Sequence, residues 1–187
     1  MSSPFYKDYD SAIDQYEAAA AIEPKNVDCH LKLAHLYEMR REFDQVIKIY
    51  KKILKHDPEN FAALMKIGLV YIRNNMRDKG LHNLKAAYKI DPDSLDLKLK
   101  LADVYLKYGN IEIGEQLALE AIELDPNNAE CHYIMGKVFQ QKDMVDDALD
   151  SYKLALTFPH HNNNIYFNIG IMYEKKKEFK DAVHSYK

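Results

Sequence analysis

Residues 27–60 read VDCHLKLAHLYEMRREFDQVIKIYKKILKHDPEN, and the following stretch of equal length, 61–94, reads FAALMKIGLVYIRNNMRDKGLHNLKAAYKIDPDS. We number the places of each stretch from 1 to 34. Both stretches have an Asp-Pro pair at places 31 and 32, and proline recurs at this constant spacing as Pro24, Pro58, Pro92 and Pro126. A chain that repeats at a fixed period of this length is a stack of small units. Such a stack offers one long surface and no natural active-site pocket, so the period favours binding over catalysis.

Each period carries two runs of apolar residues at steps of three and four. In residues 27–60 the runs lie at 33–37 and 46–53, which is the pattern of two amphipathic helices. Small residues at places 8 and 20 let the two helices approach closely. The Asp-Pro pair ends the second helix, because the residue before proline is pushed out of helical space, and Asn60 or Asn128 then caps the next helix. The sequence predicts an all-α solenoid of antiparallel helix pairs.

The repeated residues resemble the tetratricopeptide repeat, whose pattern is a large residue, Leu-Gly, Tyr, and then Ala, Phe and Pro. In residues 61–94 the corresponding residues are Gly68, Tyr71, Gly80 and Pro92. The resemblance covers nearly the whole chain and implies a right-handed superhelical solenoid. Repeats are predicted at 27–60, 61–94, 95–128, 129–162 and, truncated, 163–187, with the second helix of a partial repeat at 1–26, all in one continuous domain.

Two positions depart from the pattern. The fourth repeat has its proline one place early, at Pro159, followed by His160 and His161. Two adjacent histidines without a third ligand make a poor metal site, so we interpret this segment as an altered turn. In the second repeat Arg77 replaces the apolar residue found at place 17 elsewhere, which predicts a looser turn.

The two ends of the chain lack an evident polar cap, although a solenoid needs one because a naked end exposes a face meant for a neighbour. Residues before Val27 match only a second helix, and the fifth repeat stops at place 25, with Lys187. We therefore expect either a fragment of a longer repeat array or a protein that covers its ends by self-association.

Composition narrows the classes of partner and compartment. The formal net charge is −3, from 26 basic and 29 acidic residues, which gives no reason to expect nucleic-acid binding. The sequence has no charged-then-apolar leader and no run of about eighteen apolar residues. These features favour a cytoplasmic protein, with a ciliary or nuclear complex as the other settings.

The sequence offers little catalytic chemistry. It has no glycine-rich phosphate loop, no His-Glu-x-x-His and no nucleophile elbow, so we expect neither an enzyme nor a cofactor. Cys29 and Cys131 both stand at place 3, three repeats apart, and each is followed by histidine. Three repeats correspond to about 30 Å, too far for a disulfide. We interpret both cysteines as packing residues, with no metal.

The resemblance implies that the first helix of each repeat lines a concave groove through places 2, 5, 6, 9, 12 and 13. Places 2, 6, 9 and 13 carry seven basic and four acidic residues, a net of +3, and place 5 is apolar in every repeat. Such a groove suits a peptide with acidic and apolar residues. The predicted partner-binding residues are Lys32, Lys66, Arg73, Leu99, Lys100, Lys107, Tyr133, Lys137, Phe167 and Asn168.

Several alternatives remain open at this point. The place-6 lysines could serve only i,i+4 ion pairs, Asp28–Lys32 and Asp96–Lys100, each stabilising a helix by about 0.2–0.5 kcal/mol. The residue pattern of the repeats that bind chaperone tails does not fit this sequence. The pattern of the O-linked sugar transferase repeats has asparagine at place 6 throughout, and here only Asn168 matches it. The expected function is a non-catalytic scaffold in a multiprotein complex. A docking or regulatory arm of a larger enzyme and a self-associating module are the two alternatives.

Overall fold

A computed structural model describes residues 4–159 and 163–186, with side chains from Tyr9 onward within those ranges. This part of the chain contains eleven α-helices and no strand, so the predicted all-α repeat solenoid is confirmed. His160 and His161 lie outside the described residues, and the interpretation of their turn stays a prediction. The helices are α1 Pro4–Ile22, α2 Val27–Met39, α3 Phe43–His56, α4 Phe61–Arg73, α5 Arg77–Ile90, α6 Leu95–Lys107, α7 Ile111–Leu124, α8 Ala129–Gln141, α9 Val145–Thr157, α10 Asn164–Lys175 and α11 Phe179–Ser185.

First and second helices of each repeat begin differently. The first helices α2, α4, α6 and α8 follow a residue at place 34 whose side chain accepts a hydrogen bond from a backbone N–H of the first turn. Asn60, for example, accepts from the Ala63 N–H at 2.9 Å. The second helices α3, α5, α7 and α9 have no side-chain cap of this kind. The capping residues predicted from the sequence are therefore confirmed for α4 and α8.

The turn between the two helices of a repeat has one geometry throughout. Place 15 adopts a positive φ in each described repeat, between 58° and 77°, although only Gly109 is glycine. The turn before Arg77 has the same hydrogen bonds as the first repeat's turn. Met76 donates to the Tyr71 carbonyl at 2.8 Å, as Glu42 donates to Tyr37 at 2.9 Å. The predicted looser turn is wrong, because backbone hydrogen bonds and the place-15 residue fix the turn without an apolar side chain at place 17.

The chain divides into two compact units, residues 1–92 and 93–187. The boundary falls in the Asp-Pro turn that ends the second repeat. The single continuous domain expected from the sequence stays a prediction.

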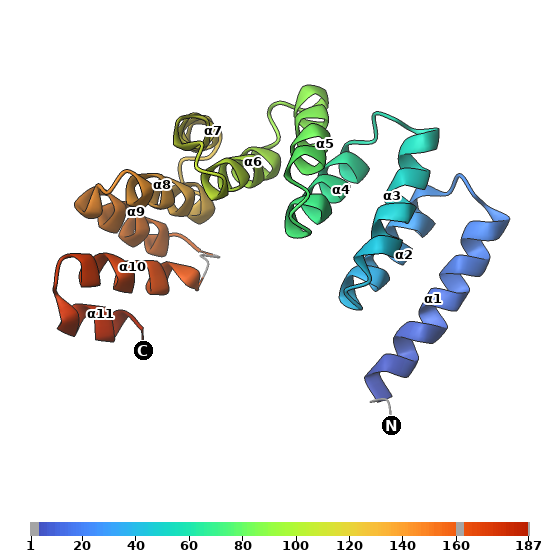
Figure 1. The fold of residues 1–187 in the computed structure, drawn as a ribbon, viewed down its shortest axis with the longest axis horizontal. Helices are drawn as coiled ribbons and strands as arrows, with labels where there is room; N and C mark the ends of the chain where they lie inside the picture. The colour runs from blue at the N-terminus through green and yellow to red at the C-terminus, as the bar shows by residue number, and fades with distance from the viewer. Residues whose placement is uncertain (1–3, 160–162, 187) are drawn as a thin grey trace. The chain divides into compact units, whose positions relative to one another are not determined.

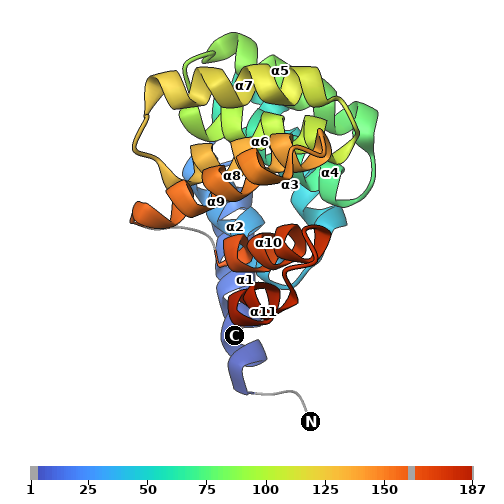
Figure 2. The same ribbon diagram turned by 90° about the vertical axis from the view of Figure 1, so that its left-hand side faces the viewer.

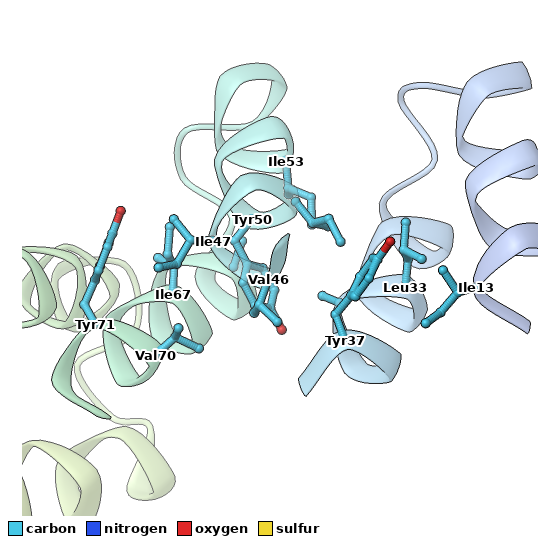
Figure 3. Packing of buried hydrophobic residues seen from close by; sticks show 13 residues of the cluster. Ile13, Leu33, Tyr37, Val46, Ile47, Tyr50, Ile53, Ile67, Val70 and Tyr71 are labelled. Atoms are coloured by element: carbon cyan, nitrogen blue, oxygen red, sulfur yellow. The ribbon is translucent and has the colours of Figure 1, made fainter. Parts of the chain in front are cut away.

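Unit 1 is held together by an apolar cluster that runs through α1, α2, α3 and α4 (Figure 3). In this cluster Ile13 of α1 lies beside Leu33 of α2, and Val46 of α3 is fully buried. The Tyr37 hydroxyl also reaches back to α1 and donates to the Glu17 carboxylate at 2.6 Å. Burial, together with this hydrogen bond, raises the pKa of Tyr37 to about 12.

Unit 2 stacks helix pairs in the same way, and α8 and α9 lie side by side in both views (Figures 1 and 2). Its core includes Tyr152, which is fully buried and donates to the Gln140 side chain at 2.6 Å. Ion pairs bind successive repeats together. Lys142 pairs with Glu115 at 2.6 Å, and Lys176 pairs with Asp146 at 2.9 Å.

Candidate partner-binding face

The residues predicted to bind a partner lie on the first helices, at places 5, 6, 9 and 13. We call the surface formed by these places and place 2 the first-helix face. The capped first turns of α2, α4, α6 and α8 start every helix at the same place of its repeat. Side chains at i, i+3 and i+4 share one face of a helix, so the named places point the same way in each. Each unit has its own first-helix face: that of unit 1 is formed by α2 and α4, and that of unit 2 by α6, α8 and α10.

Three cations of the first-helix face of unit 1 form no ion pair with a carboxylate of the described residues. Lys32 of α2 and Lys66 of α4 are exposed, and neither forms an ion pair within the described part of the chain. The predicted pair between Asp28 and Lys32 is therefore not formed. Arg73 also lacks a carboxylate partner there and lies over the Phe43 ring, 5.5 Å from its centroid. These cations are available to an anionic ligand.

Most cations of unit 2 are already neutralised. Lys100 pairs with Asp96 at 2.6 Å, which is the i,i+4 pair that the sequence offered as an alternative to binding. Lys137 pairs with Asp103 of the preceding first helix, and Lys175 pairs with Asp143 at 2.5 Å.

Lys107 is the exception among the place-13 cations of unit 2. It is exposed and lies over the neighbouring Tyr108 ring at 5.7 Å.

Glu130 adds a further negative group to the unit 2 face. Burial, followed by the nearby negative charge of Asp103, raises the pKa of the Glu130 carboxyl, while Lys100 and Lys137 act in the opposite direction. The cations and carboxylates of this face therefore interact mainly with one another. Of the net charge of +3 counted from the sequence for both units, unit 2 contributes only +1, from four basic and three acidic residues.

The apolar residues at place 5 differ in exposure. Leu99 and Tyr133 are each only 8% exposed, so they serve mainly as packing within the chain. Phe167 is 59% exposed and its ring contacts Tyr186 at a centroid distance of 5.7 Å. Asn168 donates to the Tyr133 hydroxyl at 3.4 Å and links α10 to α8.

A pocket that sequence reasoning missed lies in unit 1, against α1 and α2. It has a volume of about 360 Å³ and is lined by Tyr16, Leu31, Lys32, His35 and Leu36. Four of these residues occupy places 5, 6, 9 and 10 of one helix, and that pattern was visible in the sequence. The position of Tyr16 beside them depends on how α1 packs on α2, which the repeat pattern did not specify.

The cysteines and their neighbouring histidines have structural surroundings. Cys29 and Cys131 are buried free thiols, and burial raises the pKa of Cys131 to about 11. His30 and His132 each bring a ring nitrogen to the carbonyl of the preceding repeat's proline, at 2.9 and 2.7 Å. Among the described residues no group of three or more potential ligands is arranged for a metal ion. Within the same residues, no helix is long and apolar enough to cross a membrane.

These features define a helical-repeat protein whose first helices present charged and apolar side chains in rows. The profile of the tetratricopeptide repeat family matches residues 6–66 and 71–138, and the chain belongs to that family. The family and fold support a protein-interaction scaffold. A search of the curated proteins found no match.

Solved structures of repeat proteins resemble the chain closely in fold. The MamA protein superposes with a TM-score of 0.68 at 23% identity, over 87% of this chain and 89% of MamA. YrrB, a tetratricopeptide protein with an unusual peptide-binding site, gives 0.66 at 20% identity, over 91% and 88%. The Cut9–Hcn1 hetero-tetramer of the APC/C gives 0.84 at 15% identity, over 95% of this chain and 35% of that one. Identities this low establish likeness of fold alone.

Proposed function

We propose that this protein is a non-catalytic scaffold whose first-helix face binds a partner segment containing acidic and apolar residues. The observation that carries the proposal is the pair of exposed lysines of unit 1, Lys32 and Lys66, which form no ion pair with any described residue. Lys32 also lies beside the apolar side chains of the pocket. An unpaired surface cation gains a charge-assisted hydrogen bond when a carboxylate docks. YrrB is described as peptide-binding and Cut9 forms a hetero-tetramer, and such binding by this chain is part of the proposal.

The cytoplasm is the compartment that we propose. Two buried free thiols are compatible with a reducing environment. The complex to which the scaffold contributes is left open, as is the alternative of a docking or regulatory arm of a larger enzyme.

Affinity capture from a cell lysate, read by quantitative mass spectrometry, tests the proposal. The test variant carries Lys32→Glu, Lys66→Glu and Lys100→Glu, which reverse the charge at place 6 of three first helices. We expect partners recovered by the parent chain to be lost from this variant, because repulsion replaces the attraction for carboxylates. Circular dichroism first confirms that both chains are equally helical.

A control variant carries the same change of charge on second helices. Lys51→Glu, Lys79→Glu and Lys180→Glu alter exposed residues of α3, α5 and α11, and we expect this chain to retain the partners. If both variants lose the same partners, net charge rather than the first-helix face controls binding. If neither variant loses any, binding uses another surface and the proposal is wrong.

Self-association is a second candidate, favoured by one observation on α11. Val183 is 53% exposed, whereas Leu149, at the same place of α9, is 3% exposed because α10 packs against α9. Phe179 of α11 is similarly exposed. Sedimentation velocity over a hundredfold range of protein concentration tests this second candidate. A molar mass that equals that of the monomer at every concentration would argue against self-association.

A further inference from the structure

We infer that unit 1 alone recognises the acidic part of the partner, with Lys32 and Lys66 binding two carboxylates and the adjoining pocket taking an apolar side chain. This inference rests on the proposed function and specifies its ligand. It starts from the asymmetry between the units: the place-6 lysines of unit 1 are unpaired within the described residues, whereas Lys100 of unit 2 already pairs with Asp96. A carboxylate arriving at Lys100 must displace that partner, and one arriving at Lys32 or Lys66 displaces only water.

The pocket places an apolar binding site directly beside one of these cations. Lys32 belongs to the pocket wall, together with Leu31 and Leu36 of α2 and Tyr16 of α1. Tyr16, Leu31 and Leu36 also pack against the core of unit 1, which fixes their positions. A volume of about 360 Å³ admits a leucine or phenylalanine side chain. A partner residue bound in the pocket would therefore have its neighbour in the chain next to the Lys32 ammonium group.

The spacing of the two lysines cannot be copied from unit 2. There α6 and α8 pack together, and Lys137 pairs with Asp103, which occupies the same place of the preceding repeat. In unit 1 the packing runs from α2 to α3 and from α3 to α4, so the distance of about 8–10 Å between directly packed helices does not apply to Lys32 and Lys66. The spacing of the two carboxylates in the ligand is therefore a quantity for the experiment to determine.

The ligand is therefore an acidic peptide with two carboxylates, in which an apolar residue adjoins the carboxylate that Lys32 binds. The two carboxylates can belong to side chains within the peptide and need not include its C-terminus, because Lys32 and Lys66 lie along two helices and do not surround one closed binding site.

The experiment uses fluorescein-labelled peptides with blocked ends and the full-length chain. A first series moves one leucine and two aspartates through a nine-residue Gly-Ser frame, and fluorescence anisotropy ranks the spacings. We expect the best binder to carry leucine next to one aspartate together with the second aspartate, and the same peptide with serine in place of leucine to bind at least fivefold more weakly. Raising the salt concentration from about 50 to about 500 mM weakens binding further, because exposed ion pairs are screened.

Single variants then assign the cations. We expect Lys32→Glu or Lys66→Glu to weaken binding of the best peptide about tenfold or more, as expected for loss of a charge-assisted hydrogen bond. The matched controls are Lys100→Glu and Lys107→Glu, which make the same change in unit 2, and we expect less than a twofold effect from each. Two variants test the pocket: Leu31→Ser removes an apolar side chain from its wall, and His35→Trp fills its space. Each should abolish the preference for leucine over serine, while binding keeps its salt dependence.

Three outcomes would overturn the inference: no peptide of the series binds, the unit 2 controls weaken binding as much as Lys32→Glu, or the leucine preference survives both pocket variants. None of them refutes the proposed function by itself. That proposal fails if partner capture from the lysate is unaffected by the triple lysine variant, or if the second-helix control variant loses the same partners, so the two failures are distinguishable.

Discussion

At the scale of single residues, the packing of each repeat depends on the sizes of the side chains at places 8 and 24. A Cβ atom added to Gly136 would lie 2.5 Å from the Tyr152 ring, and one added to Gly68 would lie 2.7 Å from Leu84. Where place 24 is small, as at Ala118, place 8 is Ala102. In the repeats with glycine at place 8, the large residue of the second helix occupies the space that the glycine leaves, whereas the first repeat combines Ala34 at place 8 with the buried Tyr50 at place 24.

Gly136→Ala should lower the free energy of unfolding by up to about 2 kcal/mol. Tyr152 is fully buried and its hydroxyl is bonded to Gln140, so the ring has no free space into which to move. Inserting a methyl group into such a core costs about 1–3 kcal/mol, offset by about 1 kcal/mol because alanine is the better helix former. Urea denaturation followed by circular dichroism measures the change.

Gly170→Ala is the matched control, because its Cβ would also meet a tyrosine at place 24, Tyr186. That tyrosine is 43% exposed and can turn away, so we expect a change within about 0.5 kcal/mol. In a Tyr152→Ala background the cost of Gly136→Ala should also disappear. A similar cost at Gly136 in that background would show that backbone effects, not ring contact, are responsible.

At the scale of whole helices, different hydrogen bonds define where the first and the second helix of a repeat begin. The first helices α2, α4, α6 and α8 have a side-chain cap, whereas α10 has none. Second helices begin after a turn whose place-15 residue has positive φ and whose backbone groups bond to the preceding helix. Side-chain caps at place 34 thus specify where the first-helix face begins.

Asn60→Ala should lower the free energy of unfolding by about 1 kcal/mol, the usual cost of losing such a cap. The Asn60 side chain accepts from the Ala63 N–H and donates to Asp57 at 3.0 Å, and alanine can do neither. The control is Met76→Ala at the start of α5, where the side chain makes no cap hydrogen bond. Thermal unfolding of both variants should show the larger loss for Asn60→Ala, and equal losses would contradict the assigned role.

The fold was largely predictable from the sequence because the period, the small residues and the Asp-Pro pairs all report local geometry. The turn before Arg77 was predicted wrongly, since a side-chain pattern does not reveal backbone hydrogen bonds. The state of each lysine was not predictable either: Asp28–Lys32 and Asp96–Lys100 have the same spacing, yet only the second pair forms. Pairs between successive repeats, such as Lys137 with Asp103, depend on helix packing that one repeat's sequence does not specify.

At the scale of the whole molecule, each repeat of such a protein contacts only the repeats next to it. The free energy of unfolding is then approximately a sum of contributions from the single repeats and from the interfaces between neighbouring repeats. The substantial packing contacts within each unit join helices that follow one another, together with α6 and α8. The loss of local stability caused by a substitution should therefore become smaller with distance along the sequence. This property differs from that of a small globular domain, in which a core substitution weakens every element together.

Hydrogen exchange with mass spectrometry tests this expectation using the two variants described above. Gly136→Ala should speed amide exchange in α8 and α9, less so in α7 and α10, and leave α2 to α4 at the rates of the parent chain. Asn60→Ala should give the opposite pattern. Amide exchange should be faster in α4 and its neighbour α3, and α9 should keep the exchange rates of the parent chain. The two variants control for each other, because a general loss of stability would speed exchange in both regions. If either variant raises exchange evenly along the chain, the repeats unfold as one cooperative unit and recognition by unit 1 is energetically coupled to unit 2.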